Sequence, residues 1–169
     1  MRVWDDAVPS EVRAVLRRAL DELEELVNAE ATWSRNRYRY TEHEGRYGVR
    51  VTHPEVLAFL SSALRRTIAE ALGMDPEALA LSAVWACVDE GGFSIPRHVD
   101  DVYKRVSCVL YMGENFEGTT YLDEGLRARV VTPEEGRLCF FESRGVIHEV
   151  RKSELRRRTV QFHYEDVGG

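Results

Sequence analysis

The sequence predicts an α+β fold, with helices in the first 80 residues and short strands after them. Two observations carry this prediction. Apolar residues recur every three or four positions in two segments of the first half of the chain. From Leu79 onward, short β-rich segments alternate with turn signals. Helices followed by many strands are typical of a sandwich or barrel with helices packed on its outside.

The composition is that of one globular domain. The 169 residues are 44% hydrophobic and 31% charged, which is enough apolar material for a single core. We expect one domain over 1–169, with mainly helical support over about 1–80 and the strand core over about 80–166. The net charge of -6 argues against a nucleic-acid-binding face.

Cysteine usage and apolar runs bear on the compartment. Cys87, Cys108 and Cys139 each lie in an apolar run and form no CxxC pair, which argues against a zinc-thiolate site and a disulfide framework. The sequence shows no secretory leader pattern and no apolar run of membrane-spanning length. We therefore expect a soluble cytoplasmic protein with no membrane partner.

Two helices are predicted from their apolar spacing and their end signals. The first begins at Ser10, a residue type that caps helices, and its apolar face carries Val12, Leu16, Ala19, Leu20, Leu23, Leu26 and Val27. The second runs from Pro54, which suits a first helical turn, to Gly73, which suits a helix end. Its buried face is expected to carry Leu57, Leu60, Leu64, Ile68 and Leu72.

The segment between the helices, WSRNRYRYTEHEGRYGVRV, alternates arginine with tyrosine and turns at Glu44 and Gly45. This pattern predicts a hairpin or a flap over about 34–50, and its role stays open. The strands expected after the second helix are LALSAVWACV, KRVSCVLYM, TTYL, RARVV, RLCFF, VIHEV and RTVQFHY.

The stretch SIPRHVDD places His98 and Asp100 two residues apart, just before an apolar strand. Strand alternation directs residues i and i+2 to the same face. His148 opens a later strand, and two imidazoles with one carboxylate form the set typical of non-haem Fe(II) sites. The tripeptide alone is weak evidence, since a polar loop also explains it; His148 and a basic cluster after it make the pattern more specific.

That basic cluster is Arg156 to Arg158. One reading is a solvated strand end, as for most arginine runs. The other is that one arginine points inward and pairs with a dicarboxylate through its planar fork. An arginine inside a small barrel needs such an anion, because a buried unpaired charge is costly.

In order, the pieces RHVDD, KRVSCVLYM, FEGTTYL, PEEGRLCFFESRGVIHEV and RRRTVQFHYED resemble the catalytic core of the Fe(II)- and 2-oxoglutarate-dependent oxygenases. They are most similar to the prolyl-hydroxylase branch and span about Ala86 to Asp166. The resemblance implies a double-stranded β-helix, or jelly roll. It also implies that His98, Asp100 and His148 bind iron.

The resemblance implies a 2-oxoglutarate site as well. Arg157, followed two residues later by Thr159, matches the arginine that binds the far carboxylate, and Arg158 is the alternative. Tyr111 stands where the family often has an aromatic residue lining the pocket. Val88 replaces a tyrosine that helps to bind 2-oxoglutarate in the oxygen-sensing enzymes, a departure that bears on cofactor affinity.

The function implied is hydroxylation of an unactivated C–H bond, of a prolyl or other amino-acid side chain, free or in a peptide or protein. Oxygen is the co-substrate, succinate and carbon dioxide are released, and ascorbate is expected to sustain activity. The expected partner is a small-molecule or peptide substrate, with no nucleic acid, and the chain is expected to be a monomer or homodimer. The alternatives are a jelly-roll metalloenzyme of other chemistry and a non-catalytic iron and 2-oxoglutarate sensor.

Overall fold

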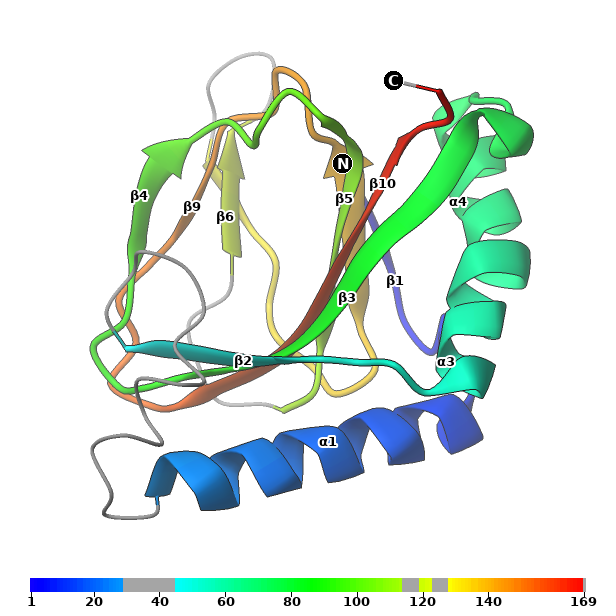
Figure 1. Ribbon diagram of the computed structural model, residues 1–169. Coiled ribbons are helices and arrows are strands. Elements are labelled where there is room, and N and C mark those ends of the chain that lie inside the picture. Colours follow the sequence, from blue (N-terminus) through cyan, green and yellow to red (C-terminus); the bar gives the residue numbers. More distant parts are fainter. Residues whose placement is uncertain (29–44, 114–118, 123–127, 169) are drawn as a thin grey trace.

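The computed structural model describes residues 1–28, 45–113, 119–122 and 128–168 (Figure 1). Two antiparallel sheets face each other, and the helices cover the outer face of the larger one. The predicted α+β class is confirmed.

The larger sheet has the strand order β1-β8-β5-β10-β3-β2. In that order its strands are Arg2–Trp4, Leu138–Glu142, Lys104–Tyr111, Arg157–Asp166, Leu79–Asp89 and Arg46–Arg50. The smaller sheet has the order β4-β9-β6-β7. Its strands are Ile95–His98, His148–Val150, Thr119–Leu122 and Ala128–Val130.

The first predicted helix is confirmed as α1, Ser10–Asn28. Its buried positions follow the predicted spacing: Val12, Leu16, Leu20, Leu23 and Val27. Leu26, predicted on the same face, is exposed, because it lies at the margin of the apolar stripe. Helix α1 packs against β2 and β3 at one end of the larger sheet.

The second predicted helix is a continuous helical run in three parts. These are α3 (Pro54–Phe59), a π-helical turn η1 (Leu60–Leu64) and α4 (Arg65–Leu72). A short 3₁₀ turn, η2 (Pro76–Ala78), leads into β3. Gly73 ends α4 with a φ of 70°, a left-handed conformation that glycine adopts without steric cost. None of the described helices is long and apolar enough to cross a membrane.

The predicted strands from LALSAVWACV to RTVQFHY are all present, and three further strands were not predicted. Strands β1 and β4 are short, and β4 contains Pro96, so neither shows a clear alternation. Strand β2 is the described end of the segment predicted as a hairpin or flap. Residues 33–44 of that segment lie outside the described residues.

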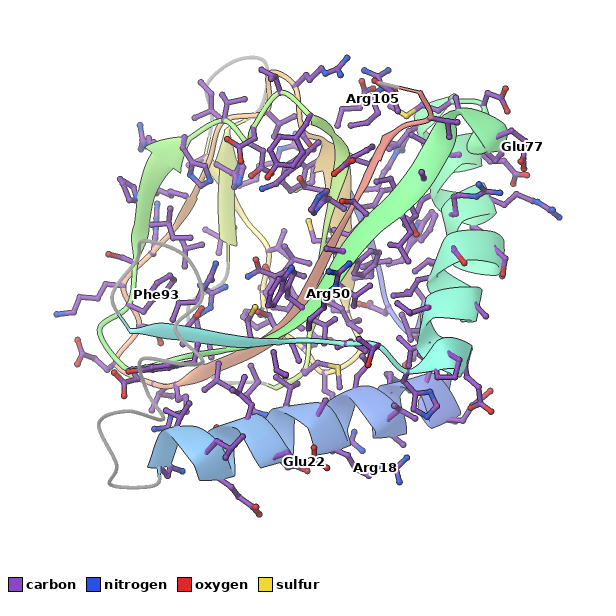
Figure 2. All side chains as sticks on the ribbon, viewed as in Figure 1. Arg18, Glu22, Arg50, Glu77, Phe93 and Arg105 are labelled. Carbon is purple, nitrogen blue, oxygen red and sulfur yellow. The ribbon has the colours of Figure 1, made fainter. Side chains whose placement is uncertain are left out.

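Strand β10 separates the main core from the inner cavity. Its apolar residues Val160, Phe162 and Tyr164 join the core between the larger sheet and the helices. The alternate positions, which include Gln161 and His163, face the space between the two sheets. Figure 2 shows side chains on both sides of the larger sheet, toward the helices and toward the smaller sheet. The polar face of this strand is therefore directed toward the smaller sheet.

Tyr164 links β10 to the helical layer through one buried hydrogen bond. Its hydroxyl donates to the carbonyl oxygen of Leu60, the first residue of the π-helical turn, at 2.7 Å. Burial raises the pKa of this hydroxyl well above its usual value, so it remains a donor at neutral pH. Tyr164→Phe should lower the free energy of unfolding by about 1 kcal/mol.

Urea denaturation measures this loss. Tyr103→Phe is the matched control, because Tyr103 is exposed and removal of its hydroxyl should change stability by less than about 0.5 kcal/mol. Equal stabilities for Tyr164→Phe and the wild type would contradict the assigned role of this bond.

Candidate active site

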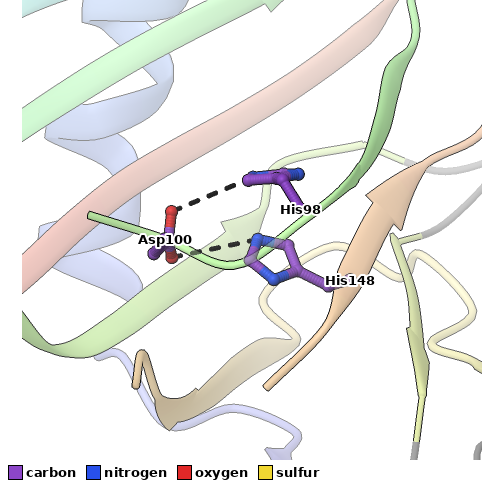
Figure 3. A group of neighbouring side chains, drawn as sticks. All are labelled: His98, Asp100 and His148. Carbon is purple, nitrogen blue, oxygen red and sulfur yellow. Dashed lines mark ion pairs between the residues drawn. The ribbon is translucent and has the colours of Figure 1, made fainter. Parts of the chain in front are cut away.

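The three residues of the predicted metal set converge at the edge where β4 meets β9. His98 ends β4 and His148 begins β9, and the two residues are direct partners in the strand register. Asp100 follows β4 and turns toward both rings (Figure 3). Its Oδ1 lies 4.0 Å from Nε2 of His98, and its Oδ2 lies 3.8 Å from Nε2 of His148. Residues 50 positions apart in the sequence are thus brought together.

Both imidazoles are oriented by backbone carbonyl groups. Nδ1 of His98 lies 2.9 Å from the oxygen of Pro96, and Nδ1 of His148 lies 3.1 Å from the oxygen of Val146. A carbonyl oxygen only accepts, so Nδ1 carries the proton in each ring. The lone pair of each ring is then on Nε2, the atom directed toward Asp100. This tautomer, with its second nitrogen bonded to a carbonyl, is typical of metal-binding histidine.

Asp100 is held in its ionised form by its neighbours. Ser107 donates to Oδ2 at 2.5 Å, and Lys104 donates to Oδ1 at 3.1 Å. Burial alone would raise the pKa of Asp100, but the charge of Lys104 and the Ser107 hydrogen bond outweigh it, and the pKa is lowered. Burial lowers the pKa of His148, which therefore stays neutral near pH 7. Neutral imidazole and ionised carboxylate are the forms that bind metals.

The geometry fits a divalent metal after a small closure. The candidate ligand atoms of His98, Asp100 and His148 all lie within 4.8 Å of one another. Metal bonds of about 2.1 Å place neighbouring ligand atoms about 3.0 Å apart. Side-chain rotations that move each ligand atom by about 1 Å would therefore complete the site. A mixed set of two nitrogens and one oxygen on one side leaves further coordination positions open.

A cavity of about 460 Å³ extends from this group along the inner face of β10. Its lining includes His98 and His148 near one end and Arg46 and Arg157 toward the other. Arg157 pairs with Asp89, whereas His163, six residues along β10, pairs with Ser107, which contacts Asp100, so the arginine and the metal set lie toward different ends of the cavity. The volume is within the range of about 300–1,000 Å³ typical of small-molecule sites.

The two candidate arginines point in different directions. Arg157 is buried and lines the cavity. Its neighbour Arg158 projects to the other face of β10 and forms ion pairs with Asp21 and Glu24 of α1, at 2.5 and 3.8 Å. Strand alternation requires this difference, since residues i and i+1 face opposite sides.

The remaining predicted residues lie deeper than the cavity surface. Thr159 and Tyr111 are fully buried and are register partners across β10 and β5. Tyr111 packs with Val131, Cys139 and Phe141 in a small inner apolar cluster. Neither Thr159 nor Tyr111 is among the described residues that line the cavity.

No protein-family model matches the chain, and no curated protein matches it by sequence. Solved structures match over nearly its whole length. A prolyl hydroxylase from Trichoplax adhaerens, in complex with a hypoxia inducible factor oxygen degradation domain peptide fragment, superimposes with a TM-score of 0.75 at 16% identity, covering 98% of this chain and 83% of that one. A Pseudomonas putida prolyl-4-hydroxylase gives a TM-score of 0.68 at 22% identity, covering 98% and 91%.

The chain has the fold of the 2OG-Fe(II) oxygenases. The predicted double-stranded β-helix, with its supporting helices, is confirmed. The same fold includes the epimerase SnoN in complex with Fe3+, alpha ketoglutarate and nogalamycin RO, which matches with a TM-score of 0.67 at 11% identity, covering 97% of this chain and 78% of that one. At these identities the matches establish the fold, and the reaction has to be argued from the site.

Three charged residues of the site were missed in the sequence. They are Arg46, the buried Asp89 that lies between Arg46 and the predicted Arg157, and Lys104, which contacts Asp100. Asp89 is the last residue of an apolar strand. From the sequence alone, an acidic residue at this position is equally consistent with an exposed turn. The spacing from Asp100 to Lys104 and Ser107 was a usable signal, because both follow at the start of the next strand.

The hydrogen bond from Ser107 to Asp100 should contribute to metal affinity. Ser107→Ala should raise the dissociation constant for Mn²⁺ about 10- to 100-fold, as for other residues that orient metal ligands. Isothermal titration calorimetry measures the change. Ser61→Ala, the same substitution at an exposed helical position, is the matched control and should leave Mn²⁺ affinity unchanged. An unchanged affinity in Ser107→Ala would contradict this role.

Proposed function

We propose that the protein is an Fe(II)- and 2-oxoglutarate-dependent dioxygenase that hydroxylates an unactivated C–H bond. One observation carries the proposal: a single cavity joins two histidines and an aspartate, with the Nε2 atoms of both rings turned toward the carboxylate, to a buried arginine. The first group suits Fe(II), and the arginine suits the far carboxylate of a 2-oxo diacid.

His98, Asp100 and His148 would hold the metal, and their own partners keep them ready for it. The Nδ1 protons are held by backbone carbonyls, and Asp100 is held by Ser107 and Lys104. These contacts fix both the protonation state and the direction of each ligand atom before a metal arrives. When bound, iron and 2-oxoglutarate supply the oxygen chemistry, and succinate and carbon dioxide are released.

Arg157 would bind the far carboxylate and so set the direction of the cosubstrate. A buried guanidinium forms paired, charge-assisted hydrogen bonds with a carboxylate. Because Arg157 projects from the same strand face as Gln161 and His163, the cosubstrate would lie along β10 with its oxo end toward the metal ligands. Arg158 faces α1 and has no such position.

For the substrate, we retain an amino-acid side chain, prolyl or other, free or in a peptide. Three apolar side chains are exposed beside the metal ligands: Val99, Val102 and Tyr103, with Val102 81% exposed. Val99 also lines the cavity. Exposed apolar surface next to a cavity is suited to an apolar substrate group. Because an epimerase has the same fold, the reaction type also belongs to the proposal.

The direct test is an anaerobic titration with Fe(II) and then 2-oxoglutarate, followed by the weak visible charge-transfer band of the chelate. Wild-type protein should give the band. His148→Ala should lose it, because a metal ligand is removed. Arg157→Ala should need at least about tenfold more 2-oxoglutarate, because charge-assisted bonds are lost.

Arg158→Ala is the matched control, since it removes the same side chain from the next position. It should behave as wild type. If the wild type binds Fe(II) and 2-oxoglutarate gives no band, the oxygenase proposal is wrong, and a jelly-roll metalloenzyme of other chemistry becomes the better account.

A further inference from the structure

Three charged side chains form one row across the larger sheet. Arg46 of β2 is the register partner of Asp89 of β3, and Asp89 is the register partner of Arg157 of β10. Their exposed fractions are 4%, 0% and 1%. Register partners on neighbouring strands project to the same side of the sheet, and here that side is the cavity side. Two guanidinium groups therefore meet one carboxylate out of contact with water.

The carboxylate of Asp89 is shared unequally. Nε of Arg46 lies 2.6 Å from Oδ1, and Nη2 of Arg46 lies 2.8 Å from Oδ2, a two-bond fork. Nη1 of Arg157 lies 3.7 Å from Oδ2, which is beyond hydrogen-bonding distance. Asp89 is thus bonded to Arg46 and only electrostatically attracted to Arg157.

Arg46 is itself held in place on two further sides. The ring of Phe93 lies 4.4 Å from its guanidinium carbon, a cation–π contact. The amide oxygen of Gln161, turned toward Arg46, accepts from Nη1 and Nη2 at 3.2 Å each. The guanidinium is therefore fixed by contacts from β3, β10 and the turn after β3.

Loss of Arg46 would leave a buried carboxylate beside Arg157. A buried charge that loses its partner is strongly destabilised, and the nearest other cation of the row is Arg157. A movement of about 1 Å would bring Asp89 into hydrogen-bonding range of Arg157. Asp89 would then occupy hydrogen-bond donors of Arg157 that a carboxylate ligand would need.

We infer that Arg46 is a positioning residue for 2-oxoglutarate: by holding both oxygens of Asp89, it prevents Asp89 from competing with the cosubstrate for Arg157. This inference rests on the proposed function. The far carboxylate of the cosubstrate is the anion with which Asp89 would otherwise compete for Arg157. Arg46 thus acts through Asp89 and needs no contact with the cosubstrate.

The test measures 2-oxoglutarate affinity of the Mn²⁺-loaded protein by isothermal titration calorimetry. Arg46→Gln should weaken binding about tenfold or more, because Asp89 then pairs with Arg157. The double variant Arg46→Gln/Asp89→Asn should return to within about threefold of the wild type, because the competing charge is gone. Arg50→Gln, the same substitution four residues along β2 at an exposed position, should bind as wild type.

Recovery in the double variant separates competition from damage to the structure. If Arg46 had only a structural role, the double variant Arg46→Gln/Asp89→Asn would bind 2-oxoglutarate as weakly as Arg46→Gln, or more weakly. Asp89→Asn alone gives a second test that does not need Arg46→Gln to fold: it should bind 2-oxoglutarate at least as tightly as the wild type, because the cavity gains positive charge. Mn²⁺ affinity should be the same in every variant.

The inference is wrong if Arg46→Gln binds 2-oxoglutarate like the wild type, if the double variant shows no recovery, or if Asp89→Asn alone weakens binding. These outcomes leave the proposed function standing, provided that the wild type binds. If the wild type binds Mn²⁺ but not 2-oxoglutarate, the proposed function fails and the inference fails with it.

Discussion

Strand β10 is hydrogen-bonded on both sides, to β3 and to β5, and the register of this double pairing determines the rest of the structure. One face of β10 packs Val160, Phe162 and Tyr164 against the helical layer. The other face directs Arg157, Gln161 and His163 into the cavity. A shift of the register by one residue would exchange the two faces. It would bury polar groups against helices and leave the cavity apolar.

The same register explains why charges are tolerated inside this small domain. Arg157 is placed opposite Asp89, and Asp89 is placed opposite Arg46. A buried ion pair contributes little stability relative to apolar side chains of similar size, so folding alone does not account for the row. Binding of a dianionic ligand, as proposed for this cavity, would account for it, because a guanidinium group then faces the carboxylate of the ligand. At the other end of the cavity, the negative charge of Asp100 is likewise stabilised by hydrogen bonds from Lys104 and Ser107.

Much of this arrangement was predictable from sequence where the signals are local. The apolar spacing of α1, the proline and glycine that bound the second helical run, and the His-x-Asp spacing all depend on residues near one another in the chain. The alternation of β10 was also sufficient to separate Arg157 from Arg158 once its inward face was known. His148, one of five histidines, was proposed from its place at the start of a later strand, and the resemblance to the oxygenase core implies the same ligand.

The features missed depend on pairing between distant segments. Arg46 and Asp89 are 43 residues apart, and their ion pair exists only because β2 pairs with β3. Strand β1 is three residues long and takes its partner, β8, from the other end of the chain. For Tyr111, alternation gave the correct face of the sheet but not its depth below the cavity surface. Such placements follow from tertiary packing, which a local pattern does not contain.

In the proposed function, one cavity binds a single ligand at two places, through the metal held by His98, Asp100 and His148 and through Arg157. The most direct test compares three ligands on the Mn²⁺-loaded wild-type protein by calorimetry: 2-oxoglutarate, 2-oxobutyrate, which lacks the far carboxylate, and glutarate, which lacks the oxo group. 2-Oxoglutarate should bind at least about tenfold more tightly than either analogue, because only 2-oxoglutarate contacts both the metal and Arg157. Equal affinities for all three ligands would contradict it.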